Sequence, residues 1–409
     1  MMNSQTAIAA DNDGKPTWKF LLRELKPKGR WLTPFNMISI PIILLGIVLI
    51  VIRFWKGIGA ITNLSQEIPW GLWIGFDVVT GVAFAGGAYV ITFMVYILNM
   101  RQYHSIVRVT VLNGFLAYLF YAGALLLDLG RPWNVINPII GNGFGTSSVL
   151  FLVAWHFLLY MMAQLIEFSP AIAEWLGKKR AHRILSGMTI AAVIFGITLS
   201  TLHQSGLGAL YLMAKDKIHP LWYNEFIPIM FFVSSIFAGL SLVIFEGSIT
   251  SKVFSDQISE KNHHAHNGIV VGLSKVCAVT MFAYFFLQVL VFVHGQHWDL
   301  LFTPMGYWYL VEMLGFVFLP MLLFFYSYRR NNTLLVKIAA IITMLGIIIN
   351  RLNVTVIGFR WDAAEHYYPS WMEIVVTLAV IFTEIWIFRW IINRMPVLRE
   401  PPAWAKNNK

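Results

Sequence analysis

Ten long apolar stretches divide this chain, and they constrain its fold more than any other feature. A helix needs about 20 consecutive apolar residues to cross a membrane, and runs of that length recur between residues 36 and 393. Only 12% of the residues are charged and 58% are hydrophobic, which is too little charge to cover a soluble protein of 409 residues. The sequence therefore predicts an all-α integral membrane protein with a bundle of about ten transmembrane helices.

The apolar runs also divide the chain into segments. The predicted spans are residues 36–54, 71–99, 105–127, 147–167, 184–212, 222–246, 268–294, 307–328, 332–356 and 370–393. They form one membrane domain at 36–393, between an N-terminal segment at 1–35 and a C-terminal tail at 394–409. We expect no cleavable signal, because the first apolar run begins near Phe35 and no small-residue cleavage site follows it.

Basic residues gather in alternate connecting segments. If the N-terminus is cytoplasmic, most of the 30 Lys and Arg residues fall on the inner side. Cytoplasmic loops of membrane proteins carry such an excess, so we expect both termini to be cytoplasmic in a bacterial or archaeal cytoplasmic membrane. The net charge of +10 is then explained by topology, and no nucleic-acid partner is expected.

The most unusual stretch runs from Thr201 to Gly208 and is followed by His219-Pro-Leu-Trp222. It places histidines, a glutamine and helix-weakening residues between two apolar runs. Polar groups at membrane depth are costly and are therefore usually functional. The alternative is a hydrogen-bonded kink between two spans.

Other polar residues of the predicted spans fall at the same depth, near the outer side. Each charge at the centre of a membrane costs about 2.5–3.5 kcal/mol on insertion scales, so the set is unlikely to be incidental. Ion pairs near water, Asp128 with Arg131 and Arg351 with Glu373, are the alternative for about half of the set. The residues are Asp77, Asp128, Arg131, His203, Gln204, His219, Glu312, Asn350, Arg351 and Glu373.

These groups suit the chemistry of a quinone. Its reduction takes two electrons and two protons, so the site needs apolar walls, a hydrogen-bond donor and a titratable group. Histidine titrates near neutral pH and serves as donor or proton carrier. The single cysteine, Cys277, excludes Cys-ligated iron–sulfur clusters and Cys-x-x-Cys haem attachment in this chain. No metal site is expected, and the loop histidines His263, His264 and His266 are more typical of a solvated loop.

Several motifs resemble the NrfD/PsrC-like superfamily of polysulfide reductase membrane subunits. They occur in the family's order across nearly the whole chain, and the match looks closest to the HybB-type branch, with DsrP- and Hmc-type subunits as close relatives. The motifs are Ile68-Pro-Trp-Gly-Leu-Trp-Ile-Gly-Phe-Asp77, Asp128-Leu-Gly-Arg-Pro-Trp133, Ser148-Val-Leu-Phe151, Thr201-Leu-His-Gln-Ser205, His219-Pro-Leu-Trp222, Ile244-Phe-Glu-Gly247 and Tyr368-Pro-Ser-Trp371.

The resemblance implies a quinone-binding membrane subunit of a respiratory oxidoreductase complex. Such subunits bind menaquinone or ubiquinone near the outer face and carry no haem or iron–sulfur cluster. They exchange electrons with an extracytoplasmic ferredoxin-like iron–sulfur subunit, which meets further catalytic or cytochrome subunits. Carried over by motif, His203 and Asp77 are candidate catalytic residues, and His203, Gln204, Asp77, Asp128, Arg131, His219 and Trp73 are candidate quinone-binding residues.

Two other functions remain open from the sequence. A haem b cytochrome needs paired histidines across facing spans, and only His156 and His203 are placed to approach each other; His156 is otherwise expected to be a core residue with a hydrogen bond. A proton-translocating or anchoring subunit is the second. Glu312, Glu384 and Glu167 are candidates for a proton path, and Glu246 is a further acidic residue at a span end.

Overall fold

The computed structural model describes residues 18–26, 28, 32–141 and 145–406. Ten helices in this part of the chain are long and apolar enough to cross a membrane. The described residues form no strand beyond a single antiparallel bridge between Ile218 and Phe359. The predicted fold class and span count are therefore confirmed, whereas most of the predicted N-terminal segment, residues 1–17, lies outside the described residues.

Each predicted span corresponds to one helical segment. The spans are α2 (Pro34–Lys56), η2 to η3 (Trp73–Ile97), η4 to α5 (Arg101–Asp128), α7 (Val149–Trp175), α8 with η6 (Lys179–Lys217), α9 (Ile227–Val253), α10 (Glu260–Gly295), α11 to α12 (Pro304–Arg330), α13 with η10 (Thr333–Ile357) and α14 (Trp371–Ile392). Shorter helices are α1 (Trp18–Leu25), η1 (Ile58–Ala60), η5 (Pro132–Asn134), α6 (Asn137–Ile140), η7 (Ser255–Gln257), η8 (Asp299–Phe302) and α15 (Ala403–Lys406).

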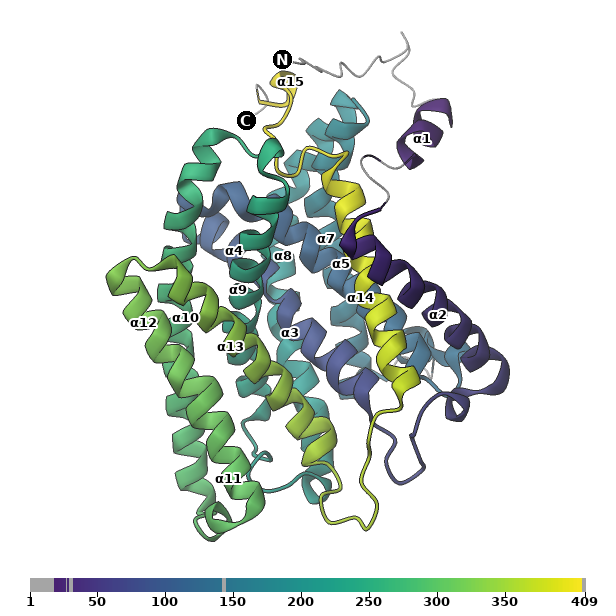
Figure 1. Cartoon of the computed structure of the whole chain (residues 1–409), viewed down its shortest axis with the longest axis vertical. Helices are drawn as coiled ribbons and strands as arrows, with labels where there is room; N and C mark the ends of the chain where they lie inside the picture. Colours follow the sequence, from purple (N-terminus) through teal and green to yellow (C-terminus); the bar gives the residue numbers. More distant parts are fainter. Residues whose placement is uncertain (1–17, 27, 29–31, 142–144, 407–409) are drawn as a thin grey trace.

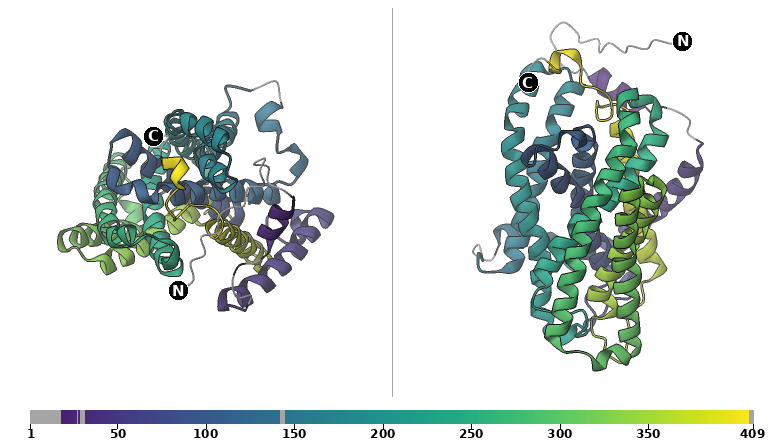
Figure 2. Two further views of the ribbon diagram at one scale, coloured as in Figure 1. Left: turned by 90° about the horizontal axis from the view of Figure 1, so that it is seen from above. Right: turned by 90° about the vertical axis from the view of Figure 1, so that its left-hand side faces the viewer.

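The second span lies at the centre of the bundle. It consists of η2 (Trp73–Thr80), α3 (Gly81–Ala85), α4 (Gly87–Thr92) and η3 (Phe93–Ile97), and it is the most buried of the ten. On one side α2 pairs with α14, and on the other α10, α12 and α13 group together (Figures 1 and 2). The polar groups of the second span are thus surrounded by other helices.

Close helix packing explains the glycines of the second span. A Cβ atom at Gly87 would lie 2.7 Å from the carbonyl oxygen of Gly239 in α9, and one at Gly86 would lie 2.7 Å from that of Ser235. Small residues allow helix backbones to approach in this way. Gly86 and Gly87 are therefore packing positions of the second span.

The described ends of the chain lie at one end of the bundle, which we call the terminal end (Figure 1). There α1 and the segment after α14 meet, because Arg394 donates from Nε to the carbonyl oxygen of Glu24 at 2.5 Å. The opposite end is the distal end, where α7 begins at Val149 and α9 at Ile227. That the terminal end faces the cytoplasm stays a prediction from the charge pattern.

The fifth span ends close to the predicted residue 212, whereas the sixth span begins later than predicted. The stretch from Thr201 to Gly208 is helical throughout, since α8 continues to Tyr211. Gly208 serves helix packing there, because a Cβ atom would lie 2.7 Å from Cα of Pro228. The sixth span begins at Ile227, five residues beyond the predicted start at Trp222.

Three spans, the second, eighth and ninth, depart from α-helical geometry near the polar residues or the membrane edge. The π-helical segments are η2, η3, η9 (Val311–Phe318) and η10 (Asn353–Ile357). Such segments are rare and frequent at functional sites. Here η2 carries Asp77, η9 carries Glu312 and η10 carries Asn353.

Candidate functional site

Asp77 lies deep in the bundle, between η2, α5 and α14. Its side chain is buried, and Oδ2 accepts a hydrogen bond of 3.0 Å from the Thr377 hydroxyl. Trp73, one turn earlier, donates from Nε1 to the carbonyl oxygen of Glu373 at 3.2 Å. The Tyr121 ring covers Gly81 on the same helix face and interacts electrostatically with Asp77. Asp77 and Trp73 of the second span therefore both form hydrogen bonds with α14.

The expected pair of Asp128 and Arg131 is not formed. Arg131 is exposed, and the cation beside Asp128 is Arg53 of α2. Arg53 is fully buried; it donates from Nε to the carbonyl oxygen of Leu127 at 2.7 Å and from Nη2 to that of Leu129. Its guanidinium thus caps the carbonyl end of α5 and faces the Asp128 carboxylate there. The sequence does not predict this pair.

His203 is enclosed by aromatic rings of neighbouring helices. Its Nδ1 lies 3.1 Å from the carbonyl oxygen of Val153, and the ring centroids of Tyr118 and Phe157 are 5.6 and 5.5 Å away. Because a carbonyl can only accept, Nδ1 carries the proton and Nε2 is the bare nitrogen of a neutral ring. Nε2 is buried and has no hydrogen-bond partner in the described protein. Nε2 of His203 is therefore a hydrogen-bonding atom that lies close to aromatic rings.

Gln204 connects this region to the second span. Its amide nitrogen donates a hydrogen bond of 2.7 Å to the carbonyl oxygen of Val82, five residues beyond Asp77. Tyr118 and Tyr121 of α5 contact the His203 and Asp77 regions respectively. Gln204, the neighbour of His203 in α8, therefore joins the fifth span to the second span one turn beyond Asp77.

Glu312 is the centre of a second buried network, which we call the Glu312 network. Its carboxylate accepts hydrogen bonds from Trp222 at 2.7 Å, Asn350 at 2.7 Å and Asn353 at 2.5 Å. Asn350 in turn accepts from Arg351 at 2.7 Å. The Asn350 amide therefore connects the buried acid Glu312 to the buried base Arg351.

Arg351 and Glu373 do not form the ion pair considered from the sequence. Arg351 lies over the Phe231 ring, 3.8 Å from its centroid, and donates to the Ser234 hydroxyl at 2.7 Å. Glu373 instead accepts from the Tyr367 hydroxyl and from the backbone nitrogen of Ser370, at 2.5 and 2.7 Å. Both are almost completely buried, so neither is an interfacial residue in contact with water.

His219 lies outside the spans, in the loop between η6 and α9. Its ring contacts Trp222 and Trp361, with centroids 5.4 and 4.7 Å away, and Nδ1 accepts from the backbone nitrogen of Leu221 at 3.2 Å. Burial, together with the neighbouring His297, lowers the pKa of His219. His219 is thus held neutral beside the Glu312 network, with which it shares the contact to Trp222.

The acidic residues considered for a proton path do not form one cluster. Glu312 belongs to the distal half, whereas Glu167 and Glu246 lie toward the terminal ends of α7 and α9. Glu384 interacts electrostatically with Glu246 and with Tyr121. Glu167 is not at the span end as expected, since α7 continues to Trp175, and its Oε1 is buried without a partner.

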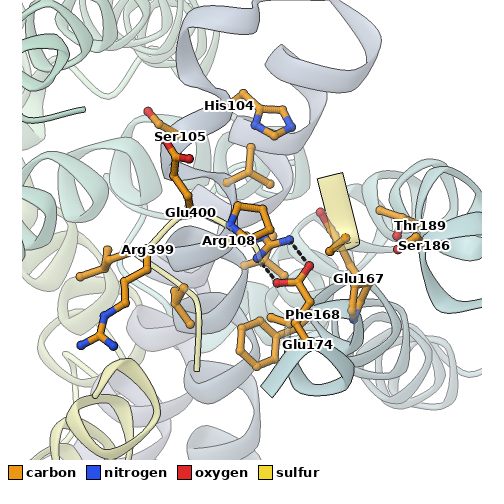
Figure 3. A pocket seen from close by; sticks show the side chains of 18 of the residues that line it. His104, Ser105, Arg108, Glu167, Phe168, Glu174, Ser186, Thr189, Arg399 and Glu400 are labelled. Atoms are coloured by element: carbon orange, nitrogen blue, oxygen red, sulfur yellow. Dashed lines mark hydrogen bonds and ion pairs between the residues drawn. The ribbon is translucent and has the colours of Figure 1, made fainter. Parts of the chain in front are cut away.

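A large cavity opens at the terminal end, which the sequence did not predict (Figure 3). Its volume is about 1110 Å³, and α5, α7, α8, α10 and the C-terminal tail line it. In its wall Arg108 donates to both carboxylate oxygens of Glu174, at 2.7 and 2.8 Å, and Nε2 of His182 lies 3.0 Å from the same carboxylate. Neither Asp77 nor His203 lines this cavity.

Two other expectations concern histidines. His156 was expected to be satisfied by a hydrogen bond, but its Nδ1 is buried without a partner. The histidines at 263, 264 and 266 belong to the first turns of α10, not to a loop. The described residues contain no group of three or more side chains placed to hold a metal ion.

Comparison with known proteins identifies the chain's family. The family model of the polysulphide reductase NrfD matches residues 60–360. A protein of Nitratidesulfovibrio vulgaris is 42% identical over 91% of this chain and 96% of its own length. The probable Ni/Fe-hydrogenase 2 b-type cytochrome subunit of Escherichia coli is 30% identical over 90% and 92%.

A third relative is the integral membrane subunit of menaquinone reductase from Nitratidesulfovibrio vulgaris. It is 29% identical over 78% of this chain and 80% of its own length. The region matched by the NrfD family model, residues 60–360, includes the second to ninth spans and most of the candidate residues. The ten apolar helices agree with an integral membrane subunit. The chain belongs to the polysulphide reductase NrfD family.

Proposed function

We propose that this chain is the quinone-binding integral membrane subunit of a respiratory oxidoreductase complex. The observation that carries the proposal is the enclosed His203, whose bare Nε2 is buried between the rings of Tyr118 and Phe157. A quinone presents two carbonyl oxygens on a flat apolar ring, so it needs such a group and such walls. The relationship to a menaquinone reductase subunit supports the same function, with menaquinone the preferred quinone.

The candidate residues have different proposed roles, which follow from their positions. His203 exchanges a proton with a quinone oxygen, because its ring accepts at one nitrogen while Val153 holds the other. Asp77 of the second span is the other titratable group. Gln204 and Trp73 position these two helices, through Val82 and Glu373 respectively. Quinone binding thus rests mainly on the second, third and fifth spans.

Three of the residues carried over by motif have more peripheral roles. Asp128 lies at the end of α5 beside Arg53, where it extends the polar region from Asp77 toward the distal surface. Arg131 is exposed, and we assign it to the surface that meets a partner. His219 connects that surface to the Glu312 network through Trp222.

Electrons come from or go to a partner. One quinone takes up two electrons and two protons to become a quinol, and the reverse reaction releases them. We propose a ferredoxin-like iron–sulfur subunit as the electron carrier, with further catalytic or cytochrome subunits behind it. The family's oxidoreductase relatives work as subunits, which supports an assembly of this kind.

Exposed aromatic side chains at the distal end form the proposed docking surface. They stand on the loops that surround the distal ends of the candidate helices, and aromatic residues are enriched where proteins dock. Exposed members of this surface are Trp133, Trp298, Phe302, Tyr368 and Trp371. Membrane lipid contacts the remaining circumference of the bundle.

We propose that the chain itself holds no haem, although the Escherichia coli relative is named a b-type cytochrome subunit. A b-type haem needs an unencumbered ring nitrogen from each of two facing histidines. His203 offers Nε2 but is closely covered by Tyr118 and Phe157. Such a covered nitrogen suits a small carbonyl oxygen better than an iron porphyrin.

Turnover measurements on the purified complex test the proposal. We expect Asp77→Asn and His203→Ala each to slow quinone-linked turnover about 100-fold, since each removes a proton-exchanging group. His294→Ala is the matched control, because His294 is an exposed histidine at the distal end of α10. Turnover at the wild-type rate in both site variants, within an assembled complex, would refute the site.

A further inference from the structure

A row of polar side chains, some buried and some half-buried, leads from the terminal-end cavity to His203. Four of them follow one face of α7, at spacings of four, four and three residues: His156, Tyr160, Gln164 and Glu167. This row spans about 17 Å of helix at 1.5 Å per residue, roughly half the thickness of a membrane's hydrocarbon core.

The row has members on the adjoining helices as well. Tyr118 of α5 contacts both Tyr160 and His203, with ring centroids 4.8 and 5.6 Å away. Ser200 of α8 lies beside the hydroxyls of Tyr118 and Tyr160. The amide of Gln164 lies against Gly114 of α5, since a Cβ there would be 2.5 Å from its nitrogen. The row is therefore enclosed by three helices.

Unused hydrogen-bonding capacity distinguishes this row from an ordinary core. Buried atoms without a protein partner of normal geometry are the hydroxyls of Tyr118, Tyr160 and Ser200, both amide atoms of Gln164, Oε1 of Glu167, Nδ1 of His156 and Nε2 of His203. Few buried polar groups in native proteins lack a partner, and ordered water usually satisfies those that do. Seven neighbouring residues share this property here, which indicates room for ordered water between them.

The two ends of the row have different surroundings. Glu167 and Tyr96 belong to the wall of the terminal-end cavity, which bears several arginines and histidines. His203 at the other end has aromatic walls and is the proposed contact of the quinone. Glu167 can thus exchange protons with water in the cavity, and His203 can exchange them with the proposed quinone.

We propose that this row is a proton-conducting path between the terminal-end cavity and His203. Glu167 exchanges protons with the cavity, and the amide and hydroxyl groups carry them to the imidazole by successive donation and acceptance. Chains of acidic residues and histidines perform this role within membranes. The path carries protons only, two for each quinone that takes up two electrons from the iron–sulfur partner, and it rests on the proposed function.

The test uses the complete complex in proteoliposomes, with Glu167→Gln, Gln164→Leu and Tyr160→Phe. Three quantities are measured: binding of a fluorescent quinol analogue, quinone-linked turnover, and the accompanying proton exchange followed with a pH-indicator dye. Glu246→Gln is the matched control, since Glu246 is a glutamate at a similar distance from the terminal end of α9 but outside the row.

We expect the row variants to bind the analogue as the wild type does, while turnover and proton exchange slow about tenfold. A small weak acid, such as formate, is expected to restore much of the rate in Glu167→Gln, which a merely structural defect would not allow. The Glu246→Gln complex is expected to match the wild type in all three measurements.

The path is refuted if the assembled row variants exchange protons at the wild-type rate, or if Glu246→Gln slows exchange equally. If Glu167→Gln or Gln164→Leu fails to assemble, Tyr160→Phe decides the test alone, because it removes one hydroxyl and keeps the ring. A wild-type complex without quinone turnover refutes the proposed function, and the path with it. Normal turnover with unaffected row variants refutes the path alone.

Discussion

At the scale of single residues, buried charge dominates this molecule. Arg351 and Glu312 are both almost fully buried and are joined through Asn350. A buried charge without compensation is expensive, so the amide bridge and the Phe231 ring beneath the guanidinium are needed to keep both groups in the bundle. Function in this region therefore depends on a complete network more than on one side chain.

Removing one member of that network tests this dependence. We expect Arg351→Met to destabilise the folded subunit by about 3 kcal/mol, because the Glu312 carboxylate is left buried without its base. Thermal unfolding of the purified complex, followed by size-exclusion chromatography, measures the loss. The double variant Glu312→Gln with Arg351→Met is expected to recover part of it, and equal losses in the single and double variants would contradict the account.

Sequence could identify many of these residues but not their partners. Asp77, His203 and Glu312 stand out because each is polar within an apolar run. Arg53 lies within the first predicted span, but the sequence does not show that it belongs to the last turn of α2 and faces Asp128. Its partner is 75 positions away in sequence, so only the packing of α2 beside α5 reveals the pair; the signal available was an arginine at the end of a long apolar run.

At the scale of helices, close approaches between backbones position the site. The crossing of α4 and α9 leaves no room for a side chain at Gly239, where a Cβ atom would lie 1.9 Å from the backbone nitrogen of Gly87. This contact holds the second span against the sixth, so the depth of Asp77 in the bundle depends on it.

A glycine substitution tests this crossing. We expect Gly239→Ala to cost about 1–3 kcal/mol of stability, because the two backbones must separate. Gly123→Ala is the matched control, since Gly123 is an exposed helical glycine with nothing within 4 Å of its would-be Cβ. Yield and melting temperature of the purified subunit give the comparison, and equal values for the two variants would argue against a tight crossing.

Helix number and order could be predicted from the sequence, whereas local geometry could not. Apolar runs of about 20 residues define spans because lipid satisfies no backbone group. Gly206 and Gly208 suggested a break in the fifth span, yet α8 continues because neighbouring helices pack against them. The π-helical turns at Asp77 and Glu312 have no signal in composition, since they arise from tertiary contacts.

At the scale of the whole molecule, the two ends of the bundle differ in kind. The distal end combines buried polar networks with exposed aromatic loops, while the terminal end holds a cavity of about 1110 Å³ with an ion pair in its wall. That cavity forms where α5, α7, α8 and the C-terminal tail meet, as in the bond from Arg108 to the carbonyl oxygen of Pro396. Such a meeting of distant segments is invisible in the sequence.

The central claim, that a quinone binds beside His203, is tested most directly by a binding titration. A fluorescent quinol analogue is titrated against the purified complex, wild type beside His203→Ala. We predict saturable quenching in the wild type and a dissociation constant about tenfold or more higher in the variant, which is about 1.4 kcal/mol of lost binding free energy. Equal affinity in both complexes would contradict the account.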